Sequence, residues 1–118
     1  MSINDFSIGV DIELIQRFKS LDRRKSGNFL TKIFTEKEIN YCFSKKAPAQ
    51  NLTARFVAKE AIIKAIKSLS KKAPALNEIE ILNNAEGAPI ATVKGYNIKI
   101  SLSHCNDKAI AFCLVVKK

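Results

Sequence analysis

The segment from about Leu52 to Leu69 constrains the fold most, because its pattern predicts a helix that is apolar around nearly its whole circumference. At about 100° per residue, apolar side chains fill one flank and most of the far side of this helix. Such a helix is typical of a buried central element, against which the rest of the chain must pack. Its apolar positions are Leu52, Phe56, Ala58, Ala61, Ile62, Ile63, Ala65, Ile66 and Leu69.

Four charged side chains interrupt this predicted helix. Glu60 and Lys64 form one narrow polar strip, and Arg55 and Lys59 form a second strip beside apolar residues. Burying a charge costs free energy unless it is paired or binds something, so these residues suggest an anionic ligand held through a metal. The alternative fits the pattern equally well, because Glu60 and Lys64 stand in the favourable i,i+4 order that often decorates a solvated helix face.

A second unusual position is Asp11. Residues 8–12 alternate apolar side chains with Gly9 and Asp11, which predicts a strand with one apolar face. Because Asp is depleted in strands, Asp11 either lies at the end of the strand and caps a following helix, or is a metal ligand. Two carboxylates from distant segments, Asp11 and Glu60, suit Mg²⁺, which completes its shell with water and phosphate oxygens.

The remaining pattern predicts a single α+β domain over residues 1–118, because one strand is followed by helices and then by a run of antiparallel strands. A capping box formed by Thr35 and Glu38 marks the start of one helix. The expected elements are a basic amphipathic helix from Leu14 to near Gly27, a helix over 36–44, a linker over 47–50, the long helix, a loop over 70–77, and strands over 79–82, 89–93, 96–103 and 109–116.

Composition narrows the class of protein. No apolar run is long enough to span a membrane and the N-terminus lacks the pattern of a signal peptide, so a cytoplasmic protein is expected. Cys42, Cys105 and Cys113 fit neither a disulfide framework nor a zinc site and are expected to be reduced thiols. The net charge of +9 predicts an acidic partner or a polyanionic ligand. Nucleic acid is a weaker candidate, because basic and aromatic residues are not interleaved.

Several short motifs occur in one order along the chain. They are Gly9–Ile12 leading to Arg17, Phe34–Thr35 with Glu38, Arg55–Ala61 with Lys64–Ala65, Gly87–Pro89 and Ser101–His104. Each motif alone is common, but the combination is specific. Over nearly its whole length the chain resembles the holo-acyl-carrier-protein synthases, the small class of 4′-phosphopantetheinyl transferases.

The resemblance implies a reaction between coenzyme A and an acidic acyl carrier protein. A serine hydroxyl of the apo carrier protein attacks the phosphorus nearest pantetheine, and adenosine 3′,5′-bisphosphate leaves. Asp11 and Glu60 are expected to ligate Mg²⁺, and Glu60, or a water that it orients, to accept the serine proton. His104 is expected to act in the site as a hydrogen-bonding group or proton acceptor.

The resemblance also implies binding residues and an assembly. Arg17 matches a position that grips the carrier protein. A homotrimer is expected, with the active sites at the subunit interfaces. The residues expected to bind coenzyme A are Arg55, Lys59, Lys64 and Ser103.

The sequence departs from the family pattern at one point, and one alternative function is also compatible with its composition. The run from Lys67 to Lys72 has no glycine where the family has a Gly-x-Gly-like turn, so Lys71 and Lys72 are expected to supply charge there. The rival function is a non-catalytic basic module that binds an acidic protein or nucleic acid. The presence of both carboxylates, Asp11 and Glu60, argues against a degenerate relative that only holds acidic proteins, whereas the sequence argues only weakly against a nucleic-acid binder.

Overall fold

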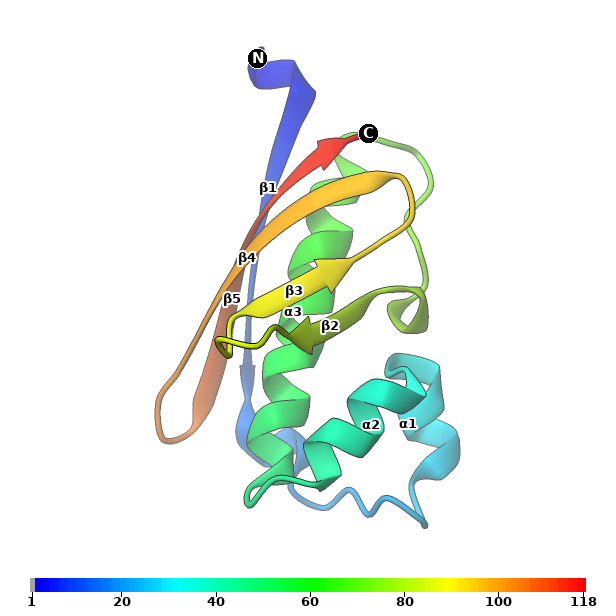
Figure 1. The fold of residues 1–118 in the computed structure, drawn as a ribbon, viewed down its shortest axis with the longest axis vertical. Coiled ribbons are helices and arrows are strands. Elements are labelled where there is room, and N and C mark those ends of the chain that lie inside the picture. Colours follow the sequence, from blue (N-terminus) through cyan, green and yellow to red (C-terminus); the bar gives the residue numbers. More distant parts are fainter. Residues whose placement is uncertain (1) are drawn as a thin grey trace.

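The computed structural model describes residues 2–118, and its organising element is one long helix, α3 (Pro48–Lys67) (Figure 1). Three strands pack along α3 as an antiparallel sheet in the order β1-β5-β4, with β1 (Phe6–Leu14), β4 (Tyr96–His104) and β5 (Lys108–Lys117). The predicted α+β class and the antiparallel sheet on a long central helix are therefore confirmed. The apolar run near the C-terminus forms the central strand, as its continuous hydrophobicity suggested.

The other elements surround α3 on its remaining sides. The hairpin of β2 (Glu80–Asn83) and β3 (Pro89–Thr92) forms a separate two-stranded sheet beside β4. The short helices α1 (Gly27–Ile33) and α2 (Glu36–Phe43) lie together at the N-terminal end of α3 (Figure 1). The predicted domain begins at Met1, which lies outside the described residues. Single-turn 3₁₀ helices cover Ile3–Asp5, Ile15–Phe18 and Leu76–Glu78.

Local signals explain where two of the helices begin. The Thr35 hydroxyl accepts from the Glu38 amide at 3.3 Å, and the Glu38 carboxylate accepts from the Thr35 amide at 2.8 Å, so the predicted capping box opens α2. α3 begins at Pro48, earlier than expected and inside the predicted linker. Proline is well suited to the first position of a helix, because its missing N–H would have no intrahelical partner there.

The predicted helix from Leu14 to Gly27 is wrong. β1 continues to Leu14, one 3₁₀ turn follows, and α1 begins at Gly27, where the helix was expected to end. The Asp22 carboxylate accepts from the amides of Arg24 and Lys25 at 2.9 and 3.1 Å, which stabilises a turn in place of a helical path. The chain between 19 and 26 is therefore a set of turns that carries basic side chains.

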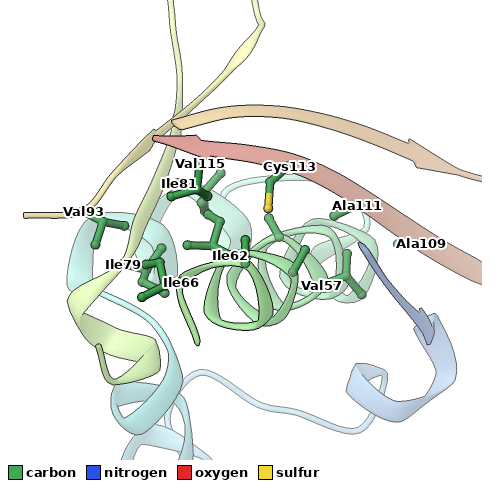
Figure 2. Close-up of a cluster of buried hydrophobic side chains, with 13 residues drawn as sticks. Val57, Ile62, Ile66, Ile79, Ile81, Val93, Ala109, Ala111, Cys113 and Val115 are labelled. Atoms are coloured by element: carbon green, nitrogen blue, oxygen red, sulfur yellow. The ribbon is translucent and has the colours of Figure 1, made fainter. Parts of the chain in front are cut away.

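The core confirms that α3 is a buried central helix (Figure 2). Ile62 and Ile66 are fully buried on α3, and Cys113 and Val115 of β5 pack onto the helix. A second cluster, which includes Phe18 and Phe34, fills the space between α1, α2 and the start of α3. No helix within residues 2–118 has the length and apolar character needed to cross a bilayer.

The apolar face of β1 points away from α3. The predicted alternation is present, but Gly9 and Asp11 face the helix. The apolar residues that alternate with them, Ile8, Val10 and Ile12, are on the outer side of the sheet. β5 continues this surface, because Val10 lies opposite Phe112 and Ile12 lies opposite Ile110. These side chains are between 39 and 57 % exposed, so one face of the sheet is an apolar surface open to solvent. We call this the outer sheet face; its most exposed members are Ile8, Val10, Ile12, Leu14, Ile110 and Phe112.

Candidate active site

Gly9 sets the distance between β1 and α3. A Cβ atom at Gly9 would lie 1.9 Å from the carbonyl oxygen of Ala61, a separation that real Cβ contacts do not reach. Only glycine therefore allows the strand to approach the helix backbone this closely. Asp11 follows two residues later on the same face of the strand, so the close approach carries its carboxylate to the surface of α3.

Asp11 and Lys64 meet at this junction. The Lys64 ammonium donates to the Asp11 carboxylate at 3.2 Å and to the carbonyl oxygen of Val10 at 3.1 Å. The Lys64 side chain is 57 % exposed and that of Asp11 is 19 % exposed. Asp11 lies within the strand, three residues before its end, so the alternative that it caps a following helix is wrong. The structure thus brings together two of the residues that the sequence singled out.

Glu60 lies one helical turn before Lys64 on α3 and is half-buried. None of the ion pairs found within residues 2–118 involves Glu60. Two carboxylates on rigid elements, Asp11 on β1 and Glu60 on α3, are thus available, and the exposed ammonium of Lys64 pairs with the first of them. In the part of the chain that is described, no three His, Cys, Asp or Glu side chains gather as a metal cluster. Two partly exposed carboxylates fit Mg²⁺, which keeps several waters and takes few protein ligands.

Arg55 points to a different side of α3, where it contacts β2. Its Nε donates to the carbonyl oxygen of Ile81 at 3.2 Å, and its Nη2 donates to the side-chain oxygen of Asn83 at 2.7 Å. Its Nη1 donates to the carbonyl oxygen of Asn51 at 3.4 Å, and its guanidinium lies 4.4 Å from the centre of the Tyr41 ring. The side chain is only 4 % exposed, so protein groups fix its orientation.

Lys59 is fully buried, between α1, α2 and α3. Its ammonium donates to the Glu38 carboxylate at 2.6 Å and to the carbonyl oxygens of Ile33 and Leu76 at 2.8 and 3.0 Å. These three bonds use all three ammonium protons. Burial lowers the pKa of Lys59, and the neighbouring Glu38 carboxylate opposes that change. The proposed contact between Lys59 and a phosphate stays a prediction, and the contacts present give this residue a structural role.

His104 and Ser103 end β4 and are both exposed. The Gln50 amide nitrogen, on the first turn of α3, lies 3.0 and 2.9 Å from the two ring nitrogens of His104. Ser103 lies opposite Ile110 on the outer sheet face, and His104 lies opposite Ala109 on the inner side. Their proposed roles in binding and catalysis stay predictions. A hollow at this end of the sheet is lined by Ile12, Ser103, His104, Cys105, Lys108, Ala109 and Ile110.

The candidate residues thus form two groups within one chain. Asp11, Glu60 and Lys64 lie at the junction of α3 with β1, which is an edge strand of its sheet. Arg55 contacts β2 through Asn83, and His104, at the end of β4, contacts Gln50 on the first turn of α3. No hydrogen bond or ion pair within residues 2–118 joins Arg55 or His104 to Asp11, Glu60 or Lys64.

Arg17 is exposed beside the end of β1. It forms an ion pair with Glu13, and its guanidinium lies 5.1 Å from the centre of the Phe56 ring. The turns after it carry further exposed cations. A shallow groove in these turns is lined by Leu21, Asp22, Arg23, Arg24 and Phe43. The cations of this basic surface are Arg17, Lys19, Arg23, Arg24 and Lys25.

The run from Lys67 to Lys72 turns without glycine. No non-glycine residue within 2–118 has a positive φ, so this turn needs no left-handed backbone. The chain leaves α3 through a bond from the Ser70 amide to the carbonyl oxygen of Ile66 at 2.9 Å. Lys71 and Lys72 are exposed at this end of the helix, and the charge that they are expected to supply there stays a prediction.

Sequence reasoning missed the side chains that hold the candidate residues in place. Gln50 contacts His104, and Tyr41 contacts Arg55, across sequence separations that no local pattern reports. Glu38 was identified as part of a capping box, but its pairing with Lys59 across 21 residues was not. The one usable signal was Lys59 itself, because a cation on an apolar helix face requires a partner.

The sequence of this chain is similar to a known protein family and to several of its members. The family model described as the 4′-phosphopantetheinyl transferase superfamily matches residues 7–113. A holo-[acyl-carrier-protein] synthase of Thermodesulfovibrio yellowstonii is 43 % identical over 110 residues, which cover 92 % of this chain and 96 % of that protein. A holo-[acyl-carrier-protein] synthase of Chlorobaculum parvum is 40 % identical over 112 residues, with coverages of 92 and 96 %.

Solved structures show the same fold. A holo-(acyl-carrier-protein) synthase of Bacillus anthracis, in complex with CoA (3′,5′-ADP), is 28 % identical with a TM-score of 0.78. The match covers 95 % of this chain and 96 % of that one. The Helicobacter pylori holo-[acyl-carrier-protein] synthase, in complex with coenzyme A, is 28 % identical with a TM-score of 0.74, and the coverages are 94 and 99 %.

Proposed function

This chain belongs to the 4′-phosphopantetheinyl transferase superfamily, and from that premise we propose that it transfers the 4′-phosphopantetheine arm of coenzyme A to a serine of apo acyl carrier protein in the cytoplasm. Coenzyme A is its substrate, and adenosine 3′,5′-bisphosphate is the second product. The observation that carries the proposal is that similarity to the synthases runs from β1 to β5. It therefore includes the two segments that bear Asp11 and Glu60.

The transfer replaces one phosphorus–oxygen bond with another. The serine oxygen of the carrier protein attacks the phosphorus nearest pantetheine, and the bond from that phosphorus to the bridging oxygen breaks. Such a reaction needs mainly positioning and charge stabilisation, so few side chains have to do covalent chemistry. Glu60 accepts the serine proton, directly or through a water, since its carboxylate is only half-buried and forms no ion pair in the described chain.

Asp11 and Glu60 are the residues that would hold Mg²⁺. The bound ion supplies positive charge that offsets the negative charge growing on the leaving phosphate. Lys64 is placed to bind a phosphate oxygen, because its exposed ammonium already lies 3.2 Å from the Asp11 carboxylate. Arg55 binds a second anionic group of coenzyme A with the N–H groups that its protein contacts leave free. His104 and Ser103 complete the substrate contacts from the end of β4.

We further propose that three copies of the chain assemble through the outer sheet face. Exposed apolar patches of this kind mark interaction surfaces, because monomeric proteins rarely leave them open. The division of the candidate residues into two groups supports the same assembly, since a neighbouring copy can supply the group that each chain lacks. A site shared between copies also explains how so short a chain can enclose a substrate as long as coenzyme A.

The assembly is tested by placing a charge on the outer sheet face. Val10→Lys is expected to convert a particle of about three chains, each of 13.1 kDa, into single chains that have lost transfer activity, because an unpaired charge is costly to bury at an interface. Light scattering coupled to gel filtration measures the mass. Ile90→Lys is the matched control, since Ile90 is similarly exposed but lies on β3. A fully active single-chain wild type would contradict the proposal.

Docking of the carrier protein is tested at Arg17. Arg17→Glu is expected to raise the KM for apo carrier protein about tenfold or more, because it reverses a charge in a surface that attracts an acidic partner. The KM for coenzyme A should stay near the wild-type value. Lys94→Glu is the control for charge reversal, since Lys94 is exposed on the turn between β3 and β4. Equal effects of Arg17→Glu on both KM values would remove the docking role.

Thermal unfolding separates this function from a basic nucleic-acid-binding module, which is one of the alternatives that the net charge of +9 allows. A ligand that binds only the native state raises the melting temperature, so coenzyme A with Mg²⁺ is expected to stabilise the protein. Stabilisation should weaken when Mg²⁺ is chelated. Stabilisation by DNA at physiological salt, with none by coenzyme A, would instead support the binding module.

A further inference from the structure

The contact between Tyr41 and Arg55 indicates how the Arg55 side chain is oriented for its substrate. Arg55 is the candidate substrate-binding cation whose orientation is most fully determined, and the described contacts show both what fixes it and what it has left to offer. The inference rests on the proposed function, because it concerns an arginine that binds coenzyme A. We propose that Tyr41 is a positioning residue for the transfer: its ring fixes the plane of the Arg55 guanidinium so that the free N–H groups point at an anionic group of the substrate.

The hydrogen bonds of Arg55 leave part of its donor capacity unused. A guanidinium has five N–H groups, and three of them are directed at Ile81, Asn51 and Asn83. Two N–H groups therefore remain without a protein acceptor, one on each terminal nitrogen, on a residue that is only 4 % exposed, and such donors suit recognition of phosphate. Asn83 is exposed beside the guanidinium, so this is a side from which an anion can approach.

The three hydrogen bonds lie in the guanidinium plane and do little to resist tilting of that plane. Tyr41 adds a contact of another kind, because the central carbon of the guanidinium lies over the Tyr41 ring, 4.4 Å from its centre. The ring is half-buried in the second core cluster, so it is a firm support. A cation over an aromatic face is attracted to it, more strongly when the pair is partly shielded from water.

Helix α2 also fixes the position of Arg55 indirectly, through the contact of Glu38 with Ile81. Glu38 lies three residues before Tyr41, which places both side chains on one side of the helix. The Glu38 carboxylate accepts from the Ile81 amide at 2.8 Å, and the Ile81 carbonyl oxygen is the acceptor for Arg55 Nε. The position of α2 therefore determines both the ring and the strand that hold the guanidinium.

Lys45 adds a second cation to the same ring. Its ammonium lies 4.7 Å from the centre of the Tyr41 ring, and the side chain is exposed. Lys45 and Arg55 both contact the uncharged Tyr41 ring. Two cations that lie near each other repel, which raises their electrostatic free energy. A bound anion offsets that repulsion. The arrangement around Tyr41 is thus suited to a negatively charged group of the substrate.

The test compares two replacements of Tyr41. Tyr41→Leu is expected to raise the KM for coenzyme A about fivefold, which corresponds to a cation–π contact of about 1 kcal/mol. The turnover number and the KM for carrier protein should stay near wild type, because the reacting atoms are not touched. Tyr41→Phe keeps the ring and should restore the wild-type KM. Tyr96→Leu is the matched control, since Tyr96 is also half-buried but none of the cations over aromatic rings within residues 2–118 lies on it.

A second background separates positioning from a general loss of stability. In an Arg55→Met protein the further change Tyr41→Leu should leave the KM for coenzyme A unaltered, because the side chain that Tyr41 positions is absent. A fivefold rise in that background as well, or an unchanged KM in Tyr41→Leu alone, would overturn the inference. If the wild-type protein does not modify the carrier protein at all, the proposed function itself fails, and this outcome differs from any change confined to the variants.

Discussion

Glu60→Gln is expected to lower transfer to carrier protein about a thousandfold, equivalent to roughly 4 kcal/mol of activation free energy. The change removes the charge of one of the two carboxylates proposed to hold Mg²⁺, and with it the group proposed to accept the serine proton. Asp11→Asn is expected to have an effect of similar size through the metal alone. Single-turnover kinetics at saturating coenzyme A measures the loss of the chemical step.

Both variants should remain folded. Glu60 takes part in none of the ion pairs within residues 2–118, and Asp11 pairs only with Lys64, whose side chain is more than half exposed. Exposed pairs of this kind contribute little to stability, so melting temperatures near wild type are expected. Glu86→Gln is the matched control, because Glu86 is exposed on the turn between β2 and β3. Full Mg²⁺-dependent turnover in either site variant would remove that residue from the metal site.

Lys59→Met is expected to lower the free energy of unfolding by about 3–5 kcal/mol, because it leaves the carboxylate of Glu38 buried and unpaired. Glu38 and Lys59 are both fully buried and lie 2.6 Å apart. The ammonium also donates one hydrogen bond each to the carbonyl oxygens of Ile33 and Leu76. Its loss therefore weakens the contacts of α3 with α1 and with the 3₁₀ turn at Leu76–Glu78. Urea unfolding followed by circular dichroism measures the difference.

The double variant Lys59→Met/Glu38→Gln should recover part of this loss, since it removes both charges while keeping the acceptor that caps α2. A loss below about 1 kcal/mol in Lys59→Met would show that the pair is not structural. The same variant also tests the sequence-based prediction for Lys59. If the folded Lys59→Met protein has a much higher KM for coenzyme A while Glu38→Gln does not, Lys59 contacts a phosphate.

The sequence predicted those parts of the molecule whose causes are local. The capping box of α2 depends on Thr35 and Glu38, three residues apart, and it forms as expected. The unbroken apolar run of β5 predicted a buried strand, and β5 is the central strand of its sheet, buried on the face toward α3 and exposed at Ile110 and Phe112 on the other. An aspartate inside β1 was unusual for a strand, and the structure places Asp11 against Lys64 of the long helix.

The errors share a physical origin, because each depended on a contact that periodicity does not report. Apolar spacing after Leu14 suggested a helix, but the Asp22 carboxylate caps a turn there instead. The alternation in β1 correctly predicted one apolar face, but it did not show whether that face packs on the core. The close contact of Gly9 with α3 turns the opposite face toward the core. The buried pairing of Lys59 with Glu38 was also missed, because Glu38 lies on another helix; the proposed contact of Lys59 with a phosphate stays a prediction.

The measurement that tests the central claim most directly is the mass of an apo acyl carrier protein after incubation with this protein, coenzyme A and Mg²⁺. The account predicts a gain equal to one phosphopantetheine arm, which is absent when EDTA is present. An unchanged mass, with a folded protein and a carrier protein that another transferase can modify, would contradict the account. A gain that persists in EDTA would preserve the transfer but contradict the role given to Asp11 and Glu60 as ligands of Mg²⁺.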